Sequence, residues 1–146
     1  MNKKRNTFLI VISVILITFC IYIDSKLTSE TFIDINTVST ELSITSDKLV
    51  RTYVKNEERA NEMFSGKIVE IKGIVKEVSF LNNRNTVILY GEDDAYGVIC
   101  DFGTNQIKEI QKLSKNDHIK IKGICKGFLK DVIVLNCLLM NTTLNE

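Results

Sequence analysis

The sequence predicts a mainly β domain in which five strands close into a Greek-key barrel. One helix precedes the first strand and another lies between the third and fourth. Between residues 67 and 140, short apolar and alternating runs are separated by polar turn clusters, the pattern of short strands. Two segments, 46–64 and 104–113, instead carry apolar residues at helical spacing. Gly73 interrupts the first strand, as expected where a strand bends sharply.

Composition limits the classes of function. The chain has 146 residues, 45% of them hydrophobic and 25% charged, which excludes a disordered tail. Nineteen Lys and Arg residues oppose eighteen Asp and Glu residues, for a net charge of +1. This balance does not favour a partner held mainly by phosphate neutralisation. A single His excludes a site with several His ligands, and we expect neither a metal nor a cofactor.

The N-terminus predicts a membrane segment. Residues 1–7 are basic, with Lys3, Lys4 and Arg5, and residues 8–23 contain no charge. Positive residues before an apolar run keep the N-terminus cytoplasmic, so the chain from residue 24 onward is expected outside the cytoplasm. This uncharged run is sixteen residues long, slightly shorter than the ~17–25 residues that usually span a bilayer.

Three interpretations of this segment stay open: an uncleaved signal anchor, a lipoprotein signal, or a buried globular helix. The sequence from Ile17 to Cys20 partly resembles a bacterial lipobox, in which the Cys is lipidated. It departs from that motif at Phe19, where a small residue is required. The first two interpretations both tether the domain to a membrane.

Residues 24–46 contain ten Ser and Thr residues and are expected to form a mostly extended tether. A flexible chain of ~23 residues has an end-to-end distance of about 25–30 Å, which keeps the domain close to the membrane. The globular domain is therefore predicted over residues 47–146.

The predicted elements follow in order. Ser46 is the expected N-cap of a helix that runs to Phe64, and Gly66 ends it. A short helix begins at Thr104, and Asn116 in the turn after it is a candidate for positive φ. The predicted strands are 67–80, 86–90, 96–102, 118–126 and 131–140.

Three meandering strands, a helix and a closing hairpin are the element order of the OB-fold. Several residues also match a family pattern: Asn56, Glu57, Ala60, 64–67, 71–73, Val75, Val98, Cys100, Leu113, Asp117, Lys122, Gly123, Gly127, Asp131, Val132, Leu135 and Cys137. With these residues the chain resembles the tRNA-anti-like OB-fold family, many of whose members are small bacterial envelope proteins. The resemblance covers roughly residues 46–140 and implies the fold rather than an activity, because the matching residues are structural.

Strand parity assigns a core face and an outer face. The alternation points one set of residues inward: Val87, Leu89, Val98, Cys100 and Phe102. The outward set is Ile88, Tyr90, Ile99 and Asp101, which is poor in the aromatic and basic residues that bind single strands. The candidate ligand-binding residues are Tyr90, Tyr96, Lys120, Lys122, Phe128 and Lys130. Convergence of the aromatic side chains beside the lysines would favour single-stranded nucleic acid.

The lysines on and after the fourth strand have two interpretations. Lys120, Lys122, Lys126 and Lys130 are expected to form a solvated face that discourages edge pairing. Alternatively, they form one side of a cleft for an anionic ligand or contact anionic lipid headgroups.

Cys100, Cys125 and Cys137 share parity with inward residues. They are predicted to be either buried free thiols or, for Cys125 and Cys137 on hairpin-linked strands, a disulfide. His118 is expected to be a surface turn residue, and no nucleophile motif accompanies it.

The sequence therefore predicts a non-enzymatic binding module, anchored to the cell membrane and displayed outside the cytoplasm. Its expected partners are the membrane, through the N-terminal segment, and an envelope protein or an oligosaccharide such as a peptidoglycan fragment. The alternative is a domain that binds single-stranded nucleic acid.

Overall fold

The computed structural model describes residue 18 and residues 39–40, 42–81 and 84–140. The chain divides into two compact units, Met1–Ile33 and Asp34–Glu146, and all of the described strands and helices belong to the second. The predicted membrane segment, residues 8–23 with Cys20, lies outside the described residues except for Thr18. Within the described part of the chain, no helix has the length and hydropathy needed to cross a membrane.

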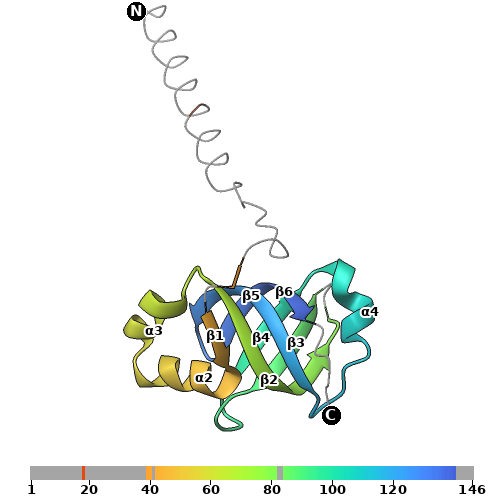
Figure 1. Ribbon diagram of the computed structural model, residues 1–146, viewed down its shortest axis with the longest axis horizontal. Coiled ribbons are helices and arrows are strands. Elements are labelled where there is room, and N and C mark those ends of the chain that lie inside the picture. Colours follow the sequence, from red (N-terminus) through yellow and green to blue (C-terminus); the bar gives the residue numbers. More distant parts are fainter. Residues whose placement is uncertain (1–17, 19–38, 41, 82–83, 141–146) are drawn as a thin grey trace, which may run out of the picture. The chain divides into compact units, whose positions relative to one another are not determined.

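Five strands form the closed barrel that the sequence predicts (Figure 1). They are β2 (Ile68–Ser79), β3 (Asn85–Tyr90), β4 (Gly97–Phe102), β5 (His118–Phe128) and β6 (Val132–Met140). Around the barrel their order is β2-β3-β4-β6-β5, and β5 pairs with β2 to close it. β4 and β6 are parallel, and the other neighbours are antiparallel. This is the Greek-key order of an OB-fold.

A sixth strand, β1 (Leu42–Thr45), corrects the predicted tether, which was expected to continue to residue 46. It pairs in parallel with the first half of β2, with Leu42 opposite Val69 and Thr45 opposite Lys72. Leu42 and Ile44 pack against the core. Because this strand is only four residues long and Ser and Thr surround it, its alternation resembles that of an extended linker.

The leading helix is divided into α2 (Ser46–Lys55) and α3 (Glu57–Phe64), so the prediction of one continuous helix was wrong. Asn56 adopts an extended conformation between them, with φ −160° and ψ 97°. Its side chain accepts a hydrogen bond from the Arg59 N–H at 2.9 Å, which caps α3. The N-cap of α2 is Thr45, one residue before the predicted Ser46.

The second predicted helix is confirmed as a short 3₁₀ turn, η1 (Thr104–Gln106), followed by α4 (Ile107–Ile110). Figure 1 shows α2 and α3 on one side of the barrel and α4 on the other. The buried Ile110 side chain attaches α4 to the core. Asn116 has φ 75°, as predicted for the turn that follows.

The inward parity predicted for β3 and β4 is confirmed, because all five inward residues belong to the core cluster. Leu49, Tyr53, Ala60 and Phe64 extend this core from the barrel into α2 and α3. The two helices are therefore part of the packed domain.

Candidate functional site

The predicted ligand-binding aromatics form two separate groups. Tyr90 lies on the outer face, with its ring centroid 5.7 Å from the Lys76 ammonium. Tyr96 and Phe128 contact each other at a centroid distance of 6.0 Å. Phe128 also stacks on Tyr53 at 5.7 Å, which turns this second group toward the helical end of the core.

The predicted lysines lie in different surroundings. Lys120 forms an ion pair with Glu70, with 3.7 Å between Nζ and Oε1. Lys122 is only 6% exposed, whereas Lys126 and Lys130 are exposed. The prediction of an edge-blocking face was wrong, because β5 is paired with β2 on one side and with β6 on the other.

The three barrel cysteines are buried and free, so the Cys125–Cys137 disulfide is not formed. The β5–β6 register places Cys125 opposite Val134, three residues before Cys137. The Cys125 thiol instead lies 3.4 Å from the Tyr53 hydroxyl, and Cys137 lies beside Cys100. Burial raises the pKa of both the Cys125 and the Cys137 thiols, which keeps them protonated at neutral pH.

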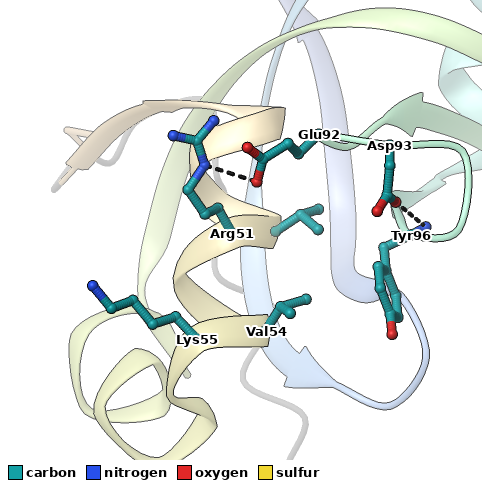
Figure 2. A pocket seen from close by; sticks show the side chains of 7 residues that line it. Arg51, Val54, Lys55, Glu92, Asp93 and Tyr96 are labelled. Carbon is teal, nitrogen blue, oxygen red and sulfur yellow. Dashed lines mark hydrogen bonds and ion pairs between the residues drawn. The ribbon is translucent and has the colours of Figure 1, made fainter.

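A pocket of about 150 Å³ lies between α2 and the loop that joins β3 to β4 (Figure 2). Its lining combines apolar residues with a charged rim: Val50, Val54 and Tyr96, and Arg51, Lys55, Glu92 and Asp93. Val54 is 52% exposed and contributes to this apolar lining. The pocket therefore presents apolar surface that is surrounded by both signs of charge.

Hydrogen bonds hold the loop side of the pocket against α2. The Arg51 guanidinium donates from Nε to the Glu92 carboxylate at 2.9 Å, as Figure 2 shows. The Asp93 carboxylate accepts the backbone N–H groups of Ala95 and Tyr96 at 3.0 and 3.3 Å. These bonds fix the rim, and they leave Lys55 with no ion pair among the residues that the structure describes.

The pocket lining contains no Ser, Cys or His that could act as a nucleophile with a neighbouring base. In the described part of the chain, no three His, Cys, Asp or Glu residues are grouped to hold a metal ion. The pocket volume of about 150 Å³ lies below the ~300–1,000 Å³ of typical small-molecule sites.

Sequence reasoning missed this pocket. Arg51 and Glu92 are 41 positions apart, and only the docking of α2 brings them together. Tyr96, one of the predicted ligand-binding residues, does line the pocket, but Val54 and Arg51 were not predicted as its neighbours there.

Comparison with known proteins decides the family, since the tRNA_anti-like family model matches residues 1–139. The chain belongs to the tRNA_anti-like family. The match extends the predicted resemblance, which began at residue 46, to the N-terminus of the chain. No curated protein matches the sequence.

Several solved structures are similar to this tRNA_anti-like domain. A lipoprotein of Klebsiella pneumoniae that is thought to bind nucleic acid aligns with a TM-score of 0.55 and 15% identity, over 68% of this chain and 92% of its own. Asparaginyl-tRNA synthetase of Entamoeba histolytica aligns with a TM-score of 0.41 and 13% identity, over 55% of this chain and 22% of the synthetase. A replication factor A related protein of Methanobacterium thermoautotrophicum aligns with a TM-score of 0.39 and 19% identity, over 53% of this chain and 84% of its own.

Proposed function

We propose that this tRNA_anti-like protein is a non-enzymatic binding module that its N-terminal segment holds at the outer surface of a membrane. Its partner is an envelope protein, recognised through the pocket between α2 and the β3–β4 loop. The observation that carries this proposal is the apolar floor of the pocket, with the half-exposed Val54, inside a rim of fixed charges.

A protein partner fits this geometry better than an oligosaccharide. Protein interfaces combine an apolar centre that excludes water with a polar rim, and a few central side chains supply most of the binding energy. The rim offers Lys55 and Asp93 as charges of opposite sign for a partner of matched charge. The only aromatic ring in the lining, Tyr96, is half-buried against Phe128, which leaves little of it for stacking on a sugar.

The membrane attachment rests on the N-terminal sequence. The basic residues and the apolar run at 8–23 have the order of a signal anchor, and the family match includes them. The lipoprotein among the solved structures supports the alternative route, lipidation of Cys20. Both routes place the domain at the same membrane surface.

Membrane topology gives the first prediction. A reporter fused after Glu146 should be active only outside the cytoplasm, and replacing Lys3, Lys4 and Arg5 by Glu should reduce or invert that orientation. Activity of the unmutated fusion in the cytoplasm would contradict the attachment. Cys20→Ser separates the two routes: a signal anchor keeps its N-terminus and its mass changes only by the exchange of sulfur for oxygen, whereas a lipoprotein also loses the lipid and the cleavage before residue 20.

The pocket gives the second prediction. Full-length chain should recover a specific protein from the native envelope, and Val54→Glu should reduce the recovery about tenfold by placing a charge on the apolar floor. Lys108→Glu, on the exposed surface of α4, is the matched control and should leave recovery unchanged. Equal recovery by both variants would refute the pocket as the binding site.

Single-stranded nucleic acid is the second candidate ligand. The observation that favours it is Tyr90 beside Lys76 on the outer face of β3, a face that OB domains use for single strands. The other residues predicted on this face, Ile88, Ile99 and Asp101, offer no further ring, and Asp101 pairs with Arg84 at 3.8 Å. Oligonucleotide titration at low salt tests this candidate, and absence of binding there would eliminate it.

A further inference from the structure

A basic groove lies on the outer surface where β2 pairs with β5. Its volume is about 310 Å³, and its lining consists of Lys72, Gly73, His118, Ile119 and Lys120. Gly73 stands directly opposite Ile119, whose side chain is buried in the core. The floor therefore consists largely of backbone, and the rim consists of three basic side chains.

The pairing register places the two lysines and the imidazole on one face. Lys72 stands directly opposite Lys120, and His118 is the next residue of β5 on the same face. Like charges that face each other across a strand pair are destabilising. Lys72 is exposed and has no ion pair in the described part of the chain, so a bound anion would relieve the repulsion.

The neighbouring carboxylates are already engaged. Glu70 pairs with Lys120 at 3.7 Å and accepts a hydrogen bond from the Ser43 hydroxyl at 3.0 Å. Asp117, which precedes His118, accepts the Ser114 backbone N–H at 2.8 Å and is thereby held in the turn. Lys120 is thus paired with a carboxylate, and Lys72 is the groove lysine that has no ion pair in the described part of the chain.

The entry point of the chain identifies the source of the anion. β1 joins the tether to the barrel, and its last residue, Thr45, is the pairing partner of Lys72. The three residue steps from Leu42 to Thr45 span about 10 Å, so the tether reaches the domain next to the groove. A membrane attachment through this tether would therefore join the barrel at the strand that neighbours the groove.

We infer that the groove binds the phosphate group of an anionic phospholipid, with Lys72, His118 and Lys120 as its ligands. This inference rests on the proposed membrane attachment. A lysine ammonium binds phosphate as a compact point charge, and basic side chains near an anionic membrane surface are attracted to it. The groove orients the domain on the membrane and leaves the separate pocket beside α2 available to a protein partner.

His118 is the only His in the chain, so its imidazole NMR signal reports on the groove without assignment. Full-length, tag-free chain is placed in phosphatidylcholine nanodiscs at constant neutral pH, and phosphatidylglycerol is then added to the lipid. The His118 signal should shift with phosphatidylglycerol content. Lys72→Gln with Lys120→Gln should reduce that shift about fivefold. Lys126→Gln with Lys130→Gln, which removes two exposed charges outside the groove, should leave it unchanged.

Other sources of phosphate give distinguishable results. The lipid assignment would be overturned if phosphatidylglycerol caused no shift of the His118 signal. This conclusion would need in addition that glycerol phosphate or an oligonucleotide, added to pure phosphatidylcholine nanodiscs, caused a saturable shift of the expected size. Equal shifts in the two double variants would also overturn it. Chain that joins nanodiscs but shows no shift would refute the groove alone. Chain that does not join them would refute the membrane attachment and the groove together.

Discussion

Tyr53→Ala should lower the free energy of unfolding by about 3–5 kcal/mol, the usual loss for removing a buried aromatic ring. Tyr53 is 1% exposed, its ring stacks on Phe128 at 5.7 Å, and it lies 6.2 Å from the Phe64 ring. The truncation would leave a cavity where α2, α3 and the end of the barrel meet. Denaturant unfolding of a chain lacking residues 1–38, followed by circular dichroism, measures this loss.

Tyr53→Phe is the control, because it keeps the ring and removes only the hydroxyl beside the Cys125 thiol. It should cost about 1 kcal/mol, the usual net contribution of one hydrogen bond. If Tyr53→Ala cost no more than Tyr53→Phe, the helices would not unfold together with the barrel, contrary to the packing described above.

Gly73→Val should lower the free energy of unfolding by about 1–3 kcal/mol, since a side chain there would be overpacked. A Cβ atom at Gly73 would lie 2.7 Å from the Ser46 Oγ atom and 2.9 Å from the Leu89 Cδ1 atom. The start of α2 approaches β2 at this position, and only a residue without a side chain permits that approach.

The neighbouring Lys72→Thr substitution is the matched control for Gly73→Val. Lys72 is exposed, so its replacement should change the free energy of unfolding by less than about 0.5 kcal/mol. Unfolding midpoints of the two variants measured side by side make the comparison. Equal midpoints would show that the close contact of α2 with β2 does not constrain Gly73.

The barrel could be predicted because each of its strands buries one face. Alternation in β3 and β4 identified Val87, Leu89, Val98, Cys100 and Phe102 as core residues, and all five are buried. β1 could not be predicted, because its four residues are too few for an alternation of apolar and polar residues to be told from the sequence of a linker. The division between α2 and α3 escaped prediction because Asn56 lies between two amphipathic segments whose apolar residues continue one stripe.

The candidate sites could be predicted only in part, because they depend on contacts between distant segments. The sequence offered Tyr96 and Phe128 as candidates, and the fold brings them together, but it places Tyr90 beside Lys76 instead. Lys122 was predicted to lie on a solvated strand face, but it is only 6% exposed. Its strand, β5, has a neighbouring strand on each side. The pocket beside α2 depends on how a helix docks on a loop, which local patterns do not encode.

Photo-crosslinking from the pocket in intact cells tests the central claim most directly. A photoreactive residue at Val54 of the full-length chain, expressed in cells that naturally carry it, should yield a discrete crosslinked species with an envelope protein. The same residue at Lys108, on the surface of α4, should not yield that species. Identical crosslinks from both positions, or none from Val54, would contradict a binding site between α2 and the β3–β4 loop.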